Sequence, residues 1–302
     1  MPNYPHGTGR RQFLHTAALG LGGIAAAGAA GELPAEVPAV WREARALAAF
    51  KHSVCRWCYS GMTVDALARA AQGLGMQSVE LLEPDEWAVA RAHGLTCAMG
   101  YAPAGDAKQR LTHGWNHVEH HAWLVPGYLE GIRLAAAAGV PNVICFSGSR
   151  MGLSDAQGLD NCAQGLRQIL PAAEKAGVTV CMELLNSKVD HPDYQADRTP
   201  WGAALVDKLG SPRFRLLYDI YHMQIMEGDV IRTVRTHREH IAHFHTAGVP
   251  GRHEIDASQE LNYPAIARAI AELGFTGFVA QEFIPTRDPI TSLGEAVRLC
   301  RV

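Results

Sequence analysis

The stretch Ala-Gly-Val-Thr-Val-Cys-Met at residues 176–182 ends a helical pattern and begins a run of apolar, mostly β-branched residues. Related phrases, each with glycine at its second position, occur at residues 74–80, 138–144 and 273–279. Glycine readily adopts the left-handed conformation that ends a helix, so each phrase indicates a helix end followed by a strand. Such a repeat predicts parallel strands joined by crossover helices.

Eight strands are expected from residue 50 onward. Their predicted ranges are 50–56, 78–82, 95–99, 142–146, 179–184, 214–219, 241–246 and 277–283. The helical patterns between them cover residues 63–74, 117–138, 156–176, 200–209, 231–237, 263–273 and 289–301. Eight repeats in one domain favour an α/β fold with a single (β/α)8 TIM barrel. A doubly wound open sheet is the alternative, but no GxGxxG motif follows the first strand.

Composition limits the number of domains and the kind of partner. The chain has 302 residues, of which 48% are hydrophobic and 19% charged, and its net charge is -3. A domain of roughly 250 residues buries about three quarters of its unfolded surface. One catalytic domain over residues 36–302 is therefore expected. The balanced charge provides no basic surface for nucleic acid, so the expected partner is a small molecule.

The first 35 residues differ from the rest of the chain. Arg10 and Arg11 precede an Ala- and Gly-rich run at about residues 17–30, which resembles a twin-arginine signal peptide and short linker. Small residues at 27–29 suit cleavage by a signal peptidase. This pattern predicts export to the periplasm or another extracytoplasmic site, without a stable membrane span after cleavage. The alternative is an uncleaved leader that anchors the protein in the membrane.

The seven cysteines are an odd number and are scattered through apolar runs. Buried free thiols are therefore expected. Cys55 and Cys58 have CxxC spacing, but no second pair of zinc ligands accompanies them. A zinc or redox role for this pair is not favoured.

The last four predicted strands each have, at their last or next-to-last position, a residue type that binds metals: Glu183, Asp219, His245 and Glu282. In a barrel of parallel strands, functional groups gather at the carboxyl ends of the strands. A buried ionisable group is costly unless it is paired or bound to metal. One such residue is explained by an ion pair at the rim, but four in succession predict a divalent metal site. Three carboxylates and one imidazole suit Mn²⁺ or Mg²⁺, and Co²⁺ or Zn²⁺ also fit.

Other ionisable residues give weaker signals. Glu83 follows the second predicted strand and is a further candidate for a carboxylate in the pocket. His113, His117 and His120 lie in a His-rich stretch that leads into a predicted helix. Their spacing favours a solvated helix start over a second metal site.

The sequence that follows the sixth predicted strand resembles hydroxypyruvate isomerases. The motif Tyr-Asp-Ile-Tyr-His-Met-Gln-Ile-Met-Glu-Gly at residues 218–228 is followed by Gly-Arg-His-Glu at 251–254 and Leu-Asn-Tyr at 261–263. Pro-Ala-Gly-Asp at 103–106, Asn186 and Asp-His-Pro at 190–192 also match. The resemblance covers roughly residues 50–300. It implies a xylose isomerase-like barrel and an isomerase that interconverts hydroxypyruvate and 2-hydroxy-3-oxopropanoate (tartronate semialdehyde).

The resemblance also implies roles for individual residues. In the wider superfamily of sugar isomerases and epimerases, the metal-ligand positions correspond to the four strand-end residues, and Glu183 and Glu282 are the acid–base pair. His222, Arg252 and Asn186 are the expected substrate-binding residues. Hydroxypyruvate isomerases carry Gln at the position of His245, whereas ketose 3-epimerases carry His. The substrate is thus a hydroxy-keto acid or a ketose.

The implied reaction is a proton transfer between adjacent carbons. A metal chelated by the substrate oxygens polarises the carbonyl, and carboxylates on opposite sides move the proton through an enediolate. Arg252 suits a substrate carboxylate because a guanidinium binds it bidentately.

An endonuclease of abasic sites would need more metal ligands and a basic face. A non-catalytic exported sugar-binding barrel would not need two acid–base carboxylates. Related barrels often form homo-oligomers, which stays an open expectation.

Overall fold

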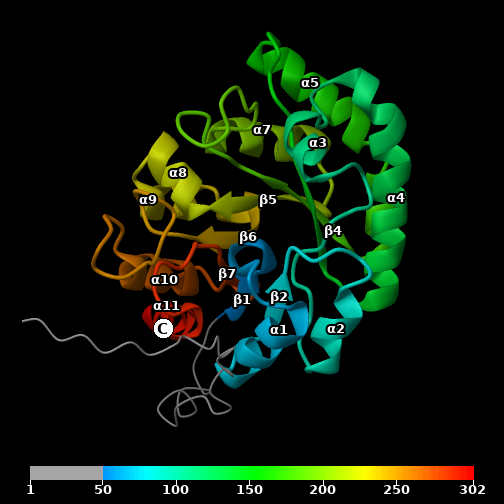
Figure 1. The fold of residues 1–302 in the computed structure, drawn as a ribbon. Coiled ribbons are helices and arrows are strands. Elements are labelled where there is room, and N and C mark those ends of the chain that lie inside the picture. Colours follow the sequence, from blue (N-terminus) through cyan, green and yellow to red (C-terminus); the bar gives the residue numbers. More distant parts are fainter. Residues whose placement is uncertain (1–49) are drawn as a thin grey trace, which may run out of the picture. The chain divides into compact units, whose positions relative to one another are not determined.

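The computed structural model describes residues 50–302. The predicted leader at residues 1–35 lies outside them. Seven strands form one parallel sheet in the order β2-β1-β7-β6-β5-β4-β3. The strands are β1 Lys51–Cys55, β2 Ser78–Glu80, β3 Asn142–Cys145, β4 Thr179–Glu183, β5 Phe214–Asp219, β6 Ile241–Thr246 and β7 Phe278–Gln281. Figure 1 shows these strands at the centre and the helices around them, as the predicted barrel requires.

The third predicted strand, residues 95–99, is not a regular strand, although it occupies the position that closes the barrel. Isolated parallel bridges join Thr96 to Ser78, and Gly100 to both Leu82 and Val143. Between them, Ala98 bonds to side chains: its N–H donates to Ser78 Oγ (2.8 Å), and its carbonyl accepts from Asn142 Nδ2 (2.8 Å). These side chains replace the ladder partners that a regular strand would use, so the prediction of a continuous strand is wrong here.

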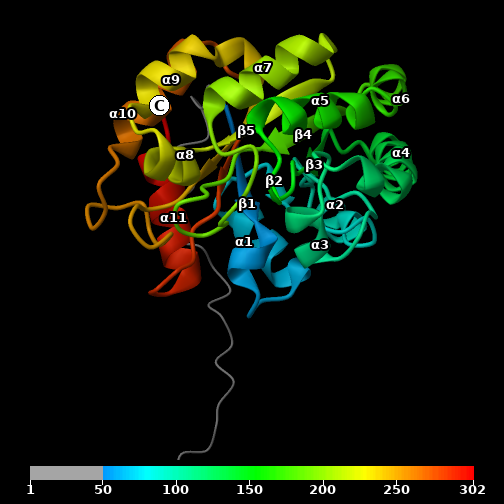
Figure 2. The ribbon, with the colours of Figure 1, turned by 90° about the horizontal axis from the view of Figure 1, so that it is seen from above.

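The helices occupy the outside of the barrel in both ribbon views (Figures 1 and 2). The α-helices are α1 Val64–Gly73, α2 Trp87–Ala92, α3 Ala107–Thr112, α4 His121–Ala138, α5 Asp155–Leu166, α6 Leu170–Ala176, α7 Thr199–Leu209, α8 Ile220–Met226, α9 Val230–Thr236, α10 Tyr263–Glu272 and α11 Pro289–Leu299. Short 3₁₀ helices are η2 Arg56–Tyr59, η3 Val118–His120 and η4 Arg238–His240. The single helix predicted over 156–176 is divided into α5 and α6, because Pro171 lies in the first turn of α6 and has no amide hydrogen to bond back to the preceding turn. The short helices α2, α3 and α8 were not predicted.

Glycine ends helices as the repeated phrase predicts. Gly139 and Gly177 cap α4 and α6 in the left-handed conformation, each with φ of 71°. Gly75 and Gly274 have similar φ values of 75° and 72° directly after the caps of α1 and α10. The chain can therefore turn from each helix into the next strand without strain at a β-carbon.

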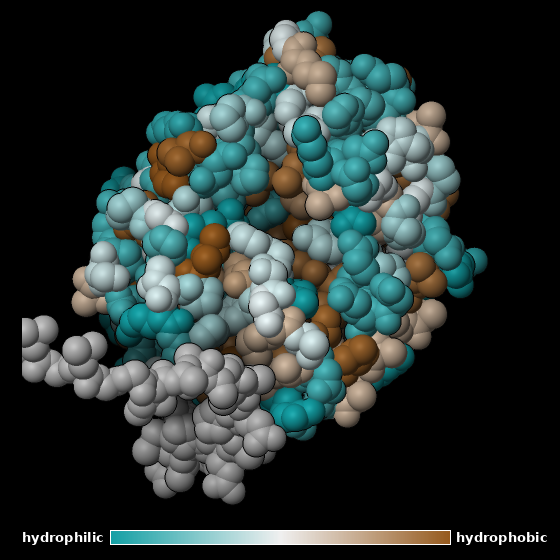
Figure 3. All heavy atoms as spheres, in the orientation of Figure 1, coloured by the Kyte–Doolittle hydropathy of each residue, from teal (hydrophilic) through white to brown (hydrophobic). Residues whose placement is uncertain are grey.

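The core is mostly apolar, although the strands also carry buried polar residues such as Ser53, Asn142 and His243. The face drawn in Figure 3 is hollowed near its centre, inside the ring of helices. All seven cysteines lie in the described part of the chain, where each is buried and none forms a disulfide. The prediction of buried free thiols is confirmed. Among residues 50–302, no helix is both long enough and apolar enough to cross a bilayer.

Candidate metal centre and active site

The four strand-end residues lie together at the carboxyl end of the barrel. Glu183 and Asp219 are the last residues of β4 and β5, His245 is the next-to-last residue of β6, and Glu282 directly follows β7. Asp219 and His245 are register partners across β5 and β6. One potential ligand atom from each residue lies within 4.8 Å of those of the other three, and all four residues are buried.

His245 directs one ring nitrogen toward Glu183 and Glu282. Its Nδ1 lies 2.9 Å from Glu282 Oε2 and 3.5 Å from Glu183 Oε1. Its Nε2 lies on the other side of the ring, 2.9 Å from Oε1 of Glu80. Nδ1 is therefore the nitrogen that can join the three carboxylates in binding a cation.

Arg252 covers the cluster from the loop after β6. Its Nη2 donates to Glu282 Oε2 at 2.6 Å and to Asp219 Oδ2 at 3.4 Å. Its guanidinium carbon lies 5.0 Å from the ring centre of Trp57 and 5.2 Å from that of Tyr221. Its Nε is buried without a hydrogen-bond partner among the described residues. A buried donor of this kind is suited to a ligand, because leaving it unbonded is costly.

The Arg252 loop is fastened to the segment that follows β7. Arg252 has a left-handed φ of 60°, which is unfavourable for a residue with a side chain. Its carbonyl accepts from Ile284 N at 2.8 Å. Two residues later, the Glu254 carboxylate accepts from the backbone N–H and hydroxyl of Thr286, each at 2.8 Å, and from Ser292 Oγ at 2.9 Å. These bonds hold the loop, and with it Arg252, beside Glu282.

His222 lies in the first turn of α8, against the cluster. Asn186 Nδ2 and His222 Nδ1 are 2.6 Å apart, and because the amide nitrogen only donates, Nδ1 accepts. Burial and the charge of Arg252 hold the pKa of His222 well below its usual value, so the ring is neutral and its hydrogen is on Nε2. This Nε2 is buried and has no hydrogen-bond partner in the described structure, although Asp219 Oδ2 lies 3.5 Å away. It can therefore donate to a substrate oxygen.

Asn186 uses its whole amide group within the protein. Besides His222, its Nδ2 donates to Asp190 Oδ2 at 2.7 Å, and its Oδ1 accepts from the backbone N–H groups of Val189 and Asp190 at 3.0 and 2.8 Å. An amide has two donor hydrogens and two acceptor lone pairs, and all four are engaged here. Asn186 therefore orients His222, and no group of its amide is free for the substrate.

The two expected acid–base carboxylates have different environments. Burial, together with the negative charge of Glu282, raises the pKa of Glu183. Burial also acts to raise the pKa of Glu282, but the positive charges of His245 and Arg252 outweigh it, and the pKa falls well below its usual value. Burial raises the pKa of Asp219 well above its usual value. A pair of carboxylates with divergent pKa values is the arrangement that acid–base catalysis uses.

The residues of the cluster fit a divalent cation. Three carboxylates and one imidazole converge, and the buried Oε1 of Glu183 has no hydrogen-bond partner among residues 50–302. Such a donor set suits Mn²⁺ or Mg²⁺ and tolerates Co²⁺ or Zn²⁺. The identity of the metal stays a prediction.

Sequence reasoning missed Glu80, the last residue of β2. This side chain is fully buried, and its Oε1 lies 2.8 Å from His243 Nε2 as well as 2.9 Å from His245 Nε2. Burial acts to raise its pKa, but the two histidines lower it to about 2. The second strand was predicted to end two residues later, at residue 82, so Glu83 was considered in place of Glu80.

Glu83 and the His-rich stretch lie outside the cluster. Glu83 forms a two-bond ion pair with Arg110, at 2.6 and 3.1 Å. Within the described residues, the groups of converging metal ligands do not include His113, His117 or His120. His117 and His120 instead bond to the backbone carbonyls of Ser149 and Gly114.

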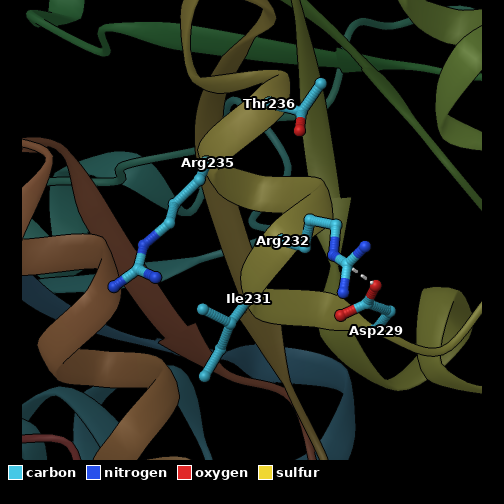
Figure 4. Close-up of a pocket in the computed structure, with 5 residues that line it drawn as sticks. All are labelled: Asp229, Ile231, Arg232, Arg235 and Thr236. Carbon is cyan, nitrogen blue, oxygen red and sulfur yellow. Dashed lines mark ion pairs between the residues drawn. The ribbon is translucent and has the colours of Figure 1, made fainter.

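An open hollow on α9 contains a different set of charges. Its volume is about 470 Å³, and it is lined by Asp229, Ile231, Arg232, Arg235 and Thr236 (Figure 4). Arg232 pairs with Asp229 at 2.9 Å, and Arg235 pairs with Glu272 of α10 at 2.9 Å. Both cations are already paired at the surface, and none of the strand-end residues lines this hollow.

Comparisons with known proteins agree with the fold. A putative hydroxypyruvate isomerase of Homo sapiens is 28% identical over 255 residues, which cover 78% of this chain and 90% of that protein. A 2-oxo-tetronate isomerase of Cupriavidus necator is 32% identical over 246 residues, 76% of this chain and 90% of that protein. The crystal structure of an AP endonuclease, family 2, from Brucella melitensis has the same fold, with a TM-score of 0.74 and 23% identity, and the match covers 82% of this chain and 99% of that one. The model of the xylose isomerase-like TIM barrel family matches residues 68–301. The chain therefore belongs to the xylose isomerase-like TIM barrel family, and within it to the isomerases.

Proposed function

We propose that this isomerase interconverts hydroxypyruvate and 2-hydroxy-3-oxopropanoate with the help of a divalent metal. The observation that carries the proposal is the buried guanidinium of Arg252, whose Nε has no partner in the described structure and which lies against Glu282. A guanidinium binds a carboxylate through two parallel hydrogen bonds. This geometry favours a substrate that bears a carboxylate over a neutral sugar.

Glu183, Asp219, His245 and Glu282 would hold the metal. When bound there, a divalent cation would polarise the substrate carbonyl and make the neighbouring C–H more acidic. Glu183 and Glu282 come from β4 and from the end of β7, with β5 and β6 between them. Carboxylates placed in this way can approach a substrate from different sides.

The proton transfer uses the difference between these carboxylates. Glu282, whose low pKa keeps it ionised, accepts the proton from the hydroxymethyl carbon. Glu183, whose raised pKa favours the protonated form, returns a proton to the former carbonyl carbon. One proton leaves carbon 3 and one reaches carbon 2, and the hydroxyl proton moves from the oxygen on carbon 3 to the oxygen on carbon 2, so the carbonyl and the hydroxyl group exchange places. Proton exchange with solvent then returns Glu282 to its ionised form and Glu183 to its protonated form, and no redox cofactor takes part.

Three further residues orient the substrate in this proposal. Arg252 binds the substrate carboxylate, and the Nε2–H of His222 donates to the oxygen that changes between carbonyl and hydroxyl. Asn186 fixes the tautomer of His222 through its bond to Nδ1. The side chain of Trp57 is 39% exposed and donates to Glu282 Oε1 at 2.7 Å, so it forms part of the entrance to the cluster.

Two other substrates have specific support. A four-carbon 2-oxo acid is suggested by the 2-oxo-tetronate isomerase relative, which shares more identity with this chain than the human relative does. A ketose that is epimerised at carbon 3 is suggested by His245, the residue that ketose 3-epimerases carry at this position. The epimerase reaction would return the proton to the carbon it left, on the opposite face.

Proton NMR in D₂O with Mg²⁺ distinguishes these functions. Hydroxypyruvate should convert to 2-hydroxy-3-oxopropanoate with deuterium at carbon 2, and EDTA should stop the reaction. Conversion of the four-carbon acid at a higher kcat/KM would reassign the substrate within the same chemistry. If hydroxypyruvate is unchanged while fructose or tagatose exchanges its C3 proton, the epimerase is the correct function.

A further inference from the structure

Glu80 connects the metal cluster to the interior of the barrel. It ends β2, while His243 and His245 both belong to β6, two residues apart and therefore on the same face of the strand. β1 and β7 separate β2 from β6 in the sheet, so Glu80 reaches across the barrel interior to make these contacts.

The hydrogen bonds of Glu80 strongly constrain the positions of its partners, because these side chains are shielded from water. All three side chains are fully buried, and one carboxylate oxygen is shared by two imidazole nitrogens at 2.8 and 2.9 Å. Removing a carboxylate from water is unfavourable unless the carboxylate is well paired. The second oxygen, Oε2, has no hydrogen-bond partner in the described part of the chain. The hydrogen bonds from the two histidines thus stabilise the buried carboxylate of Glu80.

A carboxylate at this position fixes the tautomer of His245. An ionised carboxylate only accepts hydrogen bonds, so Nε2 of His245 must carry a hydrogen that it donates to Glu80. The other nitrogen, Nδ1, lies 2.9 Å from Glu282 Oε2 and shares a hydrogen with this carboxylate in the absence of metal. A cation that binds between them would displace this hydrogen and meet the Nδ1 lone pair, while Nε2 keeps its hydrogen toward Glu80. A carboxylate behind a histidine ligand orients the ring and makes it a better donor to a metal.

We propose that Glu80 is a positioning residue that presents Nδ1 of His245 to a divalent cation and thereby sets the metal affinity of the site. This inference rests on the metal-dependent function proposed above. It adds a residue at the end of β2 to a site otherwise built from β4 to β7. Cys55 lies nearby, with its Sγ 3.7 Å from His245 Nε2, but a thiol is a weaker hydrogen-bond partner than the carboxylate.

Metal affinity measured by calorimetry with Mg²⁺ and Mn²⁺ tests this role. Glu80→Gln should weaken binding by about 10- to 100-fold, the usual effect of losing such a partner. Glu83→Gln is the matched control, because Glu83 is the same residue type three positions later but pairs with Arg110 outside the cluster. Its metal affinity should equal that of the wild type. Circular dichroism and thermal unfolding without metal verify that each variant is folded.

Nitrogen-15 NMR of the histidine rings in the Mg²⁺-loaded wild type provides a second readout that needs no variant. His245 should carry its hydrogen on Nε2, and its Nδ1 should be free of hydrogen. A hydrogen on Nδ1, or a Glu80→Gln protein with unchanged affinity, would overturn the role of Glu80 and leave the proposed function intact. If the wild type binds neither cation, the metal-dependent function fails as well.

Discussion

Two regions of the molecule pair arginine with carboxylates at nearly the same distance. In the strand-end cluster, Arg252 lies 2.6 Å from Glu282, and the two side chains are 13% and 4% exposed. On α9, Arg232 lies 2.9 Å from Asp229, and these side chains are 82% and 59% exposed. Water screens the second pair, and exposed pairs of this kind contribute about 0–1 kcal/mol to stability. The difference shows that burial, and not the distance between the charges, identifies a site capable of chemistry.

The buried region also leaves polar atoms without partners. Glu183 Oε1, His222 Nε2 and Arg252 Nε are buried and unbonded within residues 50–302. Each would cost stability in a purely structural cluster, because an unsatisfied buried group loses its hydration. One acceptor and two donors around a carboxylate-rich centre instead suit a cation and an anionic substrate. The α9 region, in contrast, satisfies its cations locally.

Replacing a carboxylate in each region should give the largest contrast. Glu183→Gln should lower kcat by about 10²- to 10⁴-fold at saturating Mg²⁺, because the amide cannot return a proton to the substrate. Glu272→Gln removes a carboxylate from the exposed pair with Arg235 and should leave kcat unchanged. The rate of hydroxypyruvate conversion by NMR measures both. A Glu183→Gln enzyme that keeps more than about a tenth of wild-type turnover would refute the catalytic role.

Replacing an arginine in each region should give a smaller effect. Arg252→Lys keeps the charge but loses the planar, two-pronged donor, and should lower kcat/KM for hydroxypyruvate by about 30- to 160-fold, equivalent to about 2–3 kcal/mol. Arg235→Lys should have no effect on kcat/KM. A large defect with a ketose and none with hydroxypyruvate would show that Arg252 does not bind a carboxylate.

Glu254 is an intermediate case, a buried carboxylate held mainly by neutral donors. Burial acts to raise its pKa, but the backbone N–H and hydroxyl of Thr286 and the hydroxyl of Ser292 outweigh it, and the pKa falls from 4.5 to about 2. A lowered pKa in the folded state stabilises the protein above pH 4.5, and this contribution disappears as the pH falls through about 2.

The expected effect of Glu254→Gln is therefore a loss of about 1–2 kcal/mol in the free energy of unfolding at pH 7. The difference between the variant and the wild type should shrink at pH 3 and nearly vanish near pH 2. Urea unfolding at these three pH values measures it. A difference that is independent of pH would show that the charge of Glu254 is not what holds the loop.

The strand ends of β4 to β7 could be predicted from sequence because the pattern is local. Each of these strands is a short apolar run, and Glu183, Asp219, His245 or Glu282 stands at or beside its end. The carboxyl ends of parallel strands meet at one face, so adjacency along the sheet follows without further information. The predicted ranges for β5 and β6 agree with the structure at both ends.

The other half of the barrel was harder to predict because its contacts are not local. Ser78 and Asn142 bond to Ala98 from two different strands, and no local pattern marks residues 95–100 as a segment without a regular ladder. Glu80 is a site residue only because β6 places two histidines opposite it. In the same way, the engagement of the Asn186 amide depends on the path of the loop through Asp190, which sequence spacing does not define.

The seven unbridged, buried thiols bear on when and where the barrel can mature. Without a disulfide in the described residues, no oxidation step separates the newly made chain from its final form, and folding can finish in a reducing compartment. The barrel therefore does not depend on an oxidising compartment to form disulfides. If residues 1–35 direct export by the twin-arginine route, the barrel could bind the proposed metal where it is synthesised, before it is exported.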